Sequence, residues 1–72
     1  MPWFEAKPNL FEMEFNKRET AFIYKDGVTW WFEVRLTDDP MADGTMIKLK
    51  AWSKNKALEE GSRKFVEYCN DR

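Results

Sequence analysis

The stretch TAFIYKDGVTWWFEVRLT, residues 20–37, decides how this chain folds. Two runs rich in β-branched and aromatic residues flank the segment Lys25-Asp26-Gly27. Asp-Gly between such runs is a strong hairpin signal, because glycine accepts the positive φ that a tight turn demands. We therefore expect a β-hairpin at the centre of the fold.

Side chains alternate across a strand, so Trp30 and Trp31 must point to opposite faces of the sheet in any register. If Asp26-Gly27 is a two-residue turn, Ile23 faces Trp30 and Ala21 faces Phe32. That register gathers one apolar face: Ala21, Ile23, Trp30, Phe32, Val34 and Leu36. The other face then holds Phe22, Tyr24 and Trp31.

A three-residue turn with a glycine bulge would instead place Phe22 and Tyr24 beside Trp30 and Phe32. It would also leave Ile23 on the face that carries Glu33 and Arg35. We favour the two-residue turn, because it keeps Ile23 in the core.

The chain has 72 residues, of which 17% are aromatic, and we expect one domain over residues 1–72. A chain this short buries only about 60% of its unfolded surface, so it needs most of its aromatic rings for the core. Only rings that alternation places opposite the core are candidates for function.

Charge and composition exclude several classes of function. Twelve Lys and Arg against thirteen Asp and Glu give a net charge of −1, which is unlike the basic balance of a duplex-DNA binder. The chain has no histidine, a single cysteine, Cys69, and no glycine-rich phosphate loop. The acidic loop 38–44 lacks the spacing of a calcium loop. We expect no catalytic residues, no cofactor and no metal site, and hence no enzyme.

A lone cysteine is typical of a reducing compartment, so the sequence predicts a cytoplasmic protein. No export leader opens the chain, and no apolar run approaches the length of a membrane span. A membrane partner is therefore not expected.

Residues 1–9 carry Pro2 and Pro8 around Trp3-Phe4 and predict an extended arm. Two interpretations of the arm stay open: its rings close one end of the core, or they bind a partner. Phe11, Met13 and Phe15 then alternate with polar residues, which predicts a strand with these three side chains inward. Residues 16–19 form a short polar connection to the hairpin.

Residues 45–52 alternate as a fourth strand, and residues 54–70 predict a helix with Ser53 as its N-cap. Trp52 is placed to pack on Ala57 as a hydrophobic staple. The expected buried stripe of the helix includes Leu58, Gly61, Ser62, Phe65 and Cys69. Gly61 within that stripe indicates close approach to a bulky ring such as that of Trp30.

The predicted fold is α+β: a four-stranded antiparallel meander over residues 10–53, with one C-terminal helix packed on one face. The second sheet face is then uncovered. We expect it to carry a partner-binding set with Met46, Arg18 and the inner acid Glu33 nearby. The set is Phe22, Tyr24, Trp31, Arg35, Lys48, Lys50 and Trp52.

Two classes of partner suit aromatic rings among cations. Such a face can stack bases and hold the phosphates of single-stranded nucleic acid, and it equally has the composition of a protein interface. A third possibility is that the arm or a second copy in a homodimer covers the face.

The stretch GTMIKLKAWS, residues 44–53, followed by a helix with Ala57-Leu58 and Phe65-Val66, resembles the single-strand-binding transcriptional coactivators related to Whirly proteins. That resemblance implies a ββββα dimer that binds single strands. In size and in its economy of strands plus one helix, the chain also resembles small phage-encoded host-takeover and anti-CRISPR proteins. This second resemblance implies an inhibitor or modulator that occupies a host protein or protein complex. We take protein binding as the main hypothesis and single-strand binding as the alternative.

Overall fold

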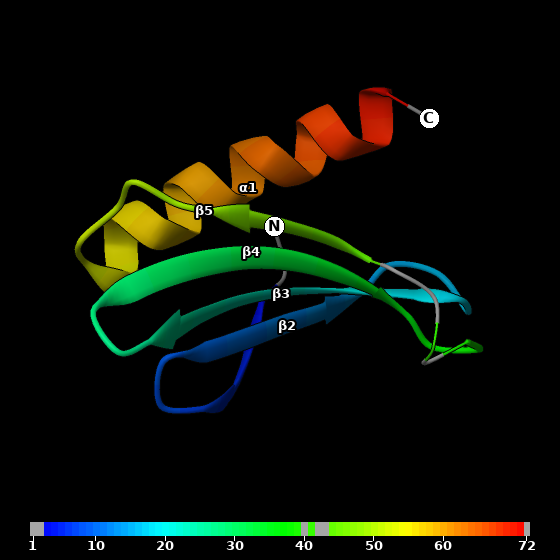
Figure 1. Ribbon diagram of the computed structural model, residues 1–72, viewed down its shortest axis with the longest axis horizontal. Coiled ribbons are helices and arrows are strands. Elements are labelled where there is room, and N and C mark those ends of the chain that lie inside the picture. The colour runs from blue at the N-terminus through cyan, green and yellow to red at the C-terminus, as the bar shows by residue number, and fades with distance from the viewer. Residues whose placement is uncertain (1–2, 40, 42–43, 72) are drawn as a thin grey trace.

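The structure is a computed structural model that describes residues 3–39, 41 and 44–71 (Figure 1). Five antiparallel strands form one sheet in the order β1-β2-β3-β4-β5, and one C-terminal helix packs on it. The α+β prediction is confirmed, with one strand more than expected. The elements are β1 Phe4–Lys7, β2 Leu10–Glu14, β3 Glu19–Asp26, β4 Thr29–Leu36, β5 Thr45–Lys48 and α1 Lys54–Asn70.

The additional strand lies within the expected N-terminal arm. Phe4 pairs with Glu12 of β2, and the register shifts between Glu5 and Lys7. The sheet therefore begins at Phe4, and the predicted boundary at residue 10 is wrong. Just before β1, the Trp3 ring packs edge-on against the Phe65 ring, with 6.3 Å between the ring centroids. The Trp3 Nε1 donates a hydrogen bond to Ser62 Oγ at 3.1 Å. The core interpretation is thus right for Trp3; Met1 and Pro2 lie outside the described residues.

The central hairpin has the predicted faces but a different turn. Asp26 pairs with Thr29, so the turn residues are Gly27 and Val28, and Ile23 faces Phe32 rather than Trp30. Gly27 has φ of 66°, and Val28 does not share a positive φ. Glycine at the first of two turn residues is the pattern of a type II′ turn, whose twist matches that of the strands. The shift of two residues preserves which side chains share a face, so the bulged alternative is wrong.

The core lies between the sheet and α1, which packs over β3 and β4. Trp30 is 2% exposed there, whereas its neighbour Trp31 is only half-buried on the opposite face. Phe15, expected inward, is partly buried against the same cluster. The buried core residues are Phe11, Met13, Ala21, Ile23, Trp30, Phe32, Val34, Leu49, Ala57 and Phe65.

The helix has the predicted bounds and cap: Ser53 Oγ accepts the backbone N–H of Lys56 at 3.3 Å. Its buried face is rotated from the predicted stripe and centres on Ala57, Gly61 and Phe65, while Cys69 is exposed. A Cβ on Gly61 would lie 2.3 Å from Cδ1 of Ile23. Close approach at Gly61 is therefore confirmed, but its neighbour is an aliphatic side chain and not the Trp30 ring.

The last strand ends earlier than predicted, at Lys48. The Leu49 N–H still donates to the Trp30 carbonyl at 2.9 Å, but the next two backbone N–H groups turn to the helix. The Glu60 carboxylate accepts the N–H of Lys50 at 3.0 and 3.1 Å and that of Ala51 at 2.9 Å. Trp52, which follows these hydrogen bonds, is 86% exposed, so the predicted hydrophobic staple between Trp52 and Ala57 is wrong.

Candidate functional site: the open face of the sheet

We call the sheet face opposite α1 the open face. Directly paired residues of an antiparallel sheet share a face, so the register defines its members. One row across the sheet runs through Leu10, Tyr24, Trp31 and Lys48, and the next through Phe4, Glu12, Phe22, Glu33 and Met46. The remaining members are Lys7, Glu14, Thr20, Asp26, Thr29 and Arg35.

The register brings together five of the seven predicted contact residues: Phe22, Tyr24, Trp31, Arg35 and Lys48. The other two lie apart, because β5 ends before them. Lys50 borders a hollow beside the helix, and Trp52 lies in the connection between β5 and α1. Arg18, also expected nearby, lies in the β2–β3 connection, where its Nε donates to Asp38 at 2.8 Å.

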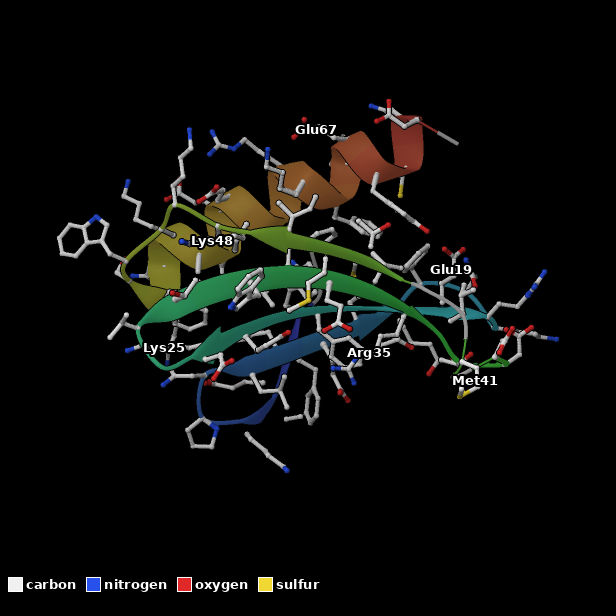
Figure 2. All side chains as sticks on the ribbon, in the orientation of Figure 1. Glu19, Lys25, Arg35, Met41, Lys48 and Glu67 are labelled. Atoms are coloured by element: carbon white, nitrogen blue, oxygen red, sulfur yellow. The ribbon has the colours of Figure 1, made fainter. Side chains whose placement is uncertain are left out.

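The centre of the open face is a charged pair stacked on a ring. Arg35 Nε donates to Glu33 Oε2 at 2.7 Å, and its second terminal nitrogen donates to Oε1 at 3.1 Å. The Arg35 guanidinium carbon lies 4.7 Å from the centroid of the Phe22 ring, within the range of a cation–π contact. Arg35, labelled in Figure 2, is thereby fixed on two sides. The pair presents a nearly neutral polar centre among aromatic rings.

Protonation at this centre is well defined. The hydrogen bonds from Arg35, opposed by burial, hold the pKa of Glu33 below its usual 4.5. Burial, followed by the hydrogen bond to Glu33, raises the pKa of Tyr24 above its usual 10.0. At neutral pH the phenol is therefore protonated beside an ionised carboxylate. Glu33 and Arg35 form the hydrogen-bonded pair, and Tyr24 on the adjacent strand interacts with it.

Replacing Arg35 with Gln should raise the pKa of Glu33, because the largest contribution to its depression is lost. A depressed folded-state pKa stabilises the fold above the unfolded-state value, and this stabilisation is lost as pH falls through the folded-state value. The variant should therefore lose less stability than wild type on acidification below pH 4.5. Carboxyl-carbon NMR titration measures the shift directly. Arg18→Gln, which breaks a remote pair, is the control, and an unchanged Glu33 pKa in Arg35→Gln would contradict the assignment.

Several members of the open face were missed from the sequence. Phe4 is 66% exposed beside Glu12, and no pattern could have placed it there while residues 1–9 were expected to form an arm. Glu33 was expected as the inner acid, but its bidentate contact with Arg35 was not predicted. An acid and a cation two apart on one strand share a face, and that spacing was the available signal.

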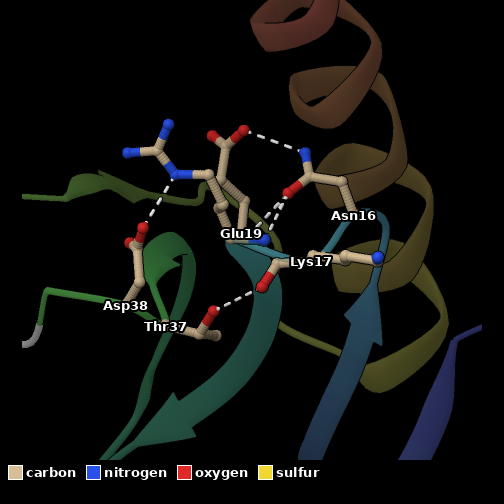
Figure 3. Close-up of polar contacts among 6 residues, drawn as sticks. Asn16, Lys17, Glu19, Thr37 and Asp38 are labelled. Atoms are coloured by element: carbon tan, nitrogen blue, oxygen red, sulfur yellow. Dashed lines mark hydrogen bonds and ion pairs between the residues drawn. The ribbon is translucent and has the colours of Figure 1, made fainter.

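A second polar cluster, at the opposite end of the sheet from the Gly27–Val28 turn, serves the fold (Figure 3). Glu19 was expected in a polar connection, but it begins β3 and is 4% exposed. Its carboxylate accepts from Asn16 Nδ2 at 3.0 Å and from the Tyr68 hydroxyl. Asn16 Oδ1 in turn accepts the N–H of Arg18 and of Glu19, each at 2.8 Å. These bonds tie the β2–β3 connection to the end of the helix.

In the described part of the chain, no group of acidic and cysteine side chains is arranged to hold a metal ion, and no helix is long and apolar enough to cross a membrane. Comparison of the chain with protein-family models, with curated proteins and with solved structures finds no match. The two resemblances noted from the sequence are therefore not confirmed. The open face is therefore the candidate functional site.

Proposed function

We propose that this protein is a non-enzymatic module that docks on another protein through the open face. The observation that carries the proposal is the uncovered set of half-buried rings, Phe22, Tyr24 and Trp31, around the Arg35–Glu33 pair. Trp, Tyr and Arg are the residues that most often anchor protein interfaces. Residues 3–9, which could have covered the face as an arm, instead pair at the sheet edge.

Charge favours a protein over a nucleic acid as the partner. Among the described residues, the open face carries Glu12, Glu14, Asp26 and Glu33 against Lys7, Arg35 and Lys48. Arg35 is already neutralised by Glu33. The remaining acidic side chains of the open face outnumber its remaining cations, and this negative charge repels a phosphate backbone. Single-stranded nucleic acid is the second candidate. Tyr24 and Trp31 are paired across β3 and β4, and Lys48 lies next to Trp31 in the same row, so two stacking rings adjoin a cation.

We further propose that the partner is a bacterial protein complex in the host cytoplasm and that binding modulates it, as in anti-CRISPR or host-takeover proteins of phage. This proposal is supported by the resemblance of the chain to those phage proteins in its small size and in its simple set of strands and one helix. The partner is therefore sought by capture from lysate of a bacterial host, with and without nuclease.

Trp31→Ala should weaken capture of the protein partner from this lysate by about 2 kcal/mol or more if Trp31 is an anchor. Capture should survive nuclease treatment. Val66→Ala, which shortens a 46% exposed side chain on the helix, is the matched control and should leave capture unchanged. Equal capture by wild type and Trp31→Ala, with the fold intact, would contradict docking through the open face.

Changing Lys48 and Lys50 to Gln separates the two candidate partners. A phosphate-binding surface would lose affinity and show a flatter dependence on salt. A protein interface centred on the rings should lose mainly association rate. Nuclease-sensitive capture together with a flattened salt dependence would favour the nucleic-acid candidate.

A further inference from the structure

The outer edge of β5 offers unpaired backbone groups. In an antiparallel ladder the hydrogen-bonded pairs alternate, and the bond from Leu49 N–H to Trp30 O fixes the phase. Thr45 and Ile47 therefore direct their N–H and C=O groups toward β4, whereas Met46 and Lys48 direct theirs outward. β5 is the last strand of the sheet, so no described strand pairs with these outward groups.

The edge ends where Glu60 intervenes. The N–H of Lys50 would be the next outward donor, but the Glu60 carboxylate accepts it. The same carboxylate accepts the Ala51 N–H and so fixes the connection against the helix. A short stretch with outward donors at Met46 and Lys48 is left at the sheet edge, next to the connection that Glu60 ties to α1.

A shallow groove runs along the flank of the helix and begins at Lys50, two residues beyond the end of β5. It consists of two adjoining hollows that share Lys50, Glu60 and Arg63 in their linings. One extends along the helix to Lys64 and Glu67, and the other extends to the exposed ring of Trp52. An exposed sheet edge can bind an extended peptide as an added strand.

The groove has an excess of positive charge. Glu59 pairs with Lys56 at 3.6 Å and Glu67 pairs with Lys64 at 3.7 Å. Glu60, which accepts two backbone N–H groups, keeps its negative charge in the lining. Among the described residues, Lys48, Lys50 and Arg63 make no ion pair. An acidic segment complements this charge. A second copy of the chain does not, because antiparallel pairing of two β5 edges would bring the same lysines together.

We propose that the β5 edge and the α1 flank bind an acidic, extended peptide segment as a sixth strand, with Trp52 as an apolar contact at one end of the groove. The peptide backbone pairs with the outward groups of Met46 and Lys48, and its carboxylates lie near Lys48, Lys50 and Arg63. This site shares Met46 and Lys48 with the open face but not its rings, so the position of the peptide-induced shifts distinguishes it from docking through Phe22 and Trp31.

The test is an NMR titration of the ¹⁵N-labelled full chain with the capped peptide Thr-Glu-Val-Glu-Val-Glu-Thr. Saturable shifts should centre on the amides of Met46 and Lys48. The counterpart with Lys in place of each Glu should bind at least about tenfold more weakly. Absence of saturable shifts, equal binding of the two peptides, or shifts centred on Phe22 and Trp31 would overturn the proposal.

Two variants at Met46 distinguish the contribution of the backbone N–H to peptide binding from that of the side chain. Met46→Pro removes an outward N–H, whereas Met46→Ala keeps it and removes the same side chain. Binding should fall at least about tenfold in the proline variant and stay near wild type in the alanine variant. Lys48→Glu and Trp52→Ala, both at exposed side chains, should each weaken binding and leave the thermal midpoint unchanged. Equal binding by all four variants would overturn the proposal.

A second copy of the chain and a nucleic acid are the two competing occupants of this site, and each would give a different result in the NMR experiment. Concentration-dependent shifts of the Met46 and Lys48 amides without peptide would assign the edge to a second copy. Displacement of the peptide by an oligothymidylate, with the same amides shifted, would assign the groove to nucleic acid. Either result would overturn the proposal.

Discussion

Trp30→Ala should lower the free energy of unfolding by about 3–5 kcal/mol, as truncation of a core tryptophan generally does. The indole is 2% exposed in the layer between sheet and helix, so its removal leaves a cavity in a close-packed core. A domain of this size has a total stability of only about 4–11 kcal/mol. The variant should therefore be partly or wholly unfolded. Urea titration followed by far-UV circular dichroism measures the loss.

Trp31→Ala is the matched control, because it makes the same change one residue away on the opposite face. Trp31 is half-buried with no layer above it, so the loss of stability should be clearly smaller and the variant should stay folded. The contrast tests the assignment of faces directly. If Trp31→Ala unfolded the domain while Trp30→Ala did not, the open face would be on the wrong side of the sheet.

Gly61→Leu should destabilise the protein by about 1–3 kcal/mol through overpacking. A Cβ at this position would lie 2.3 Å from Cδ1 and 2.7 Å from Cγ1 of Ile23, which is itself 0% exposed. Either the helix must lift from the sheet or Ile23 must leave its rotamer. A thermal melt with an unchanged or higher midpoint would refute the close packing of α1 on β3.

A double-mutant cycle identifies Ile23 as the neighbour that makes glycine necessary. Gly61→Ala and Ile23→Ala should each destabilise the protein, the first by a clash and the second by a cavity. In combination, the added methyl group should occupy part of the cavity, so the double variant should be more stable than additivity predicts. Strict additivity would show that the two sites do not interact.

The sequence predicts which side chains of the hairpin share a face of the sheet, but it does not determine which two residues form the turn. Alternation alone separates Trp30 from Trp31, and burial of Ile23 rejects the bulged turn. Placing the turn one residue later, at Gly27–Val28, leaves every face unchanged, so hydrophobic patterning could not distinguish the two registers. The positive φ at Gly27 suits glycine as the first turn residue as well as the second.

The parts of the site that were mispredicted depend on contacts remote in sequence. β1 has no alternating apolar pattern, because all four of its residues are exposed at a sheet edge, and the two prolines favoured an arm. The early end of β5 depends on Glu60, a helix residue that removes two N–H groups from the ladder. Without that contact Trp52 appeared to continue the strand. The five residues that were placed correctly all lie on strands whose alternation extends without interruption.

Neighbouring strands in the sheet are also neighbours along the chain, from β1 through β5. Every strand pairing is therefore antiparallel between successive elements, and α1 joins more distant parts by docking over β3 and β4 and by its contacts with Trp3. Short connections between successive strands close with little loss of chain entropy, and contacts between residues near in sequence favour rapid folding. The sheet can thus assemble hairpin by hairpin as the chain leaves the ribosome. The aromatic rings are then exposed in an unfolded state only briefly, which limits aggregation of a protein whose binding surface is itself apolar.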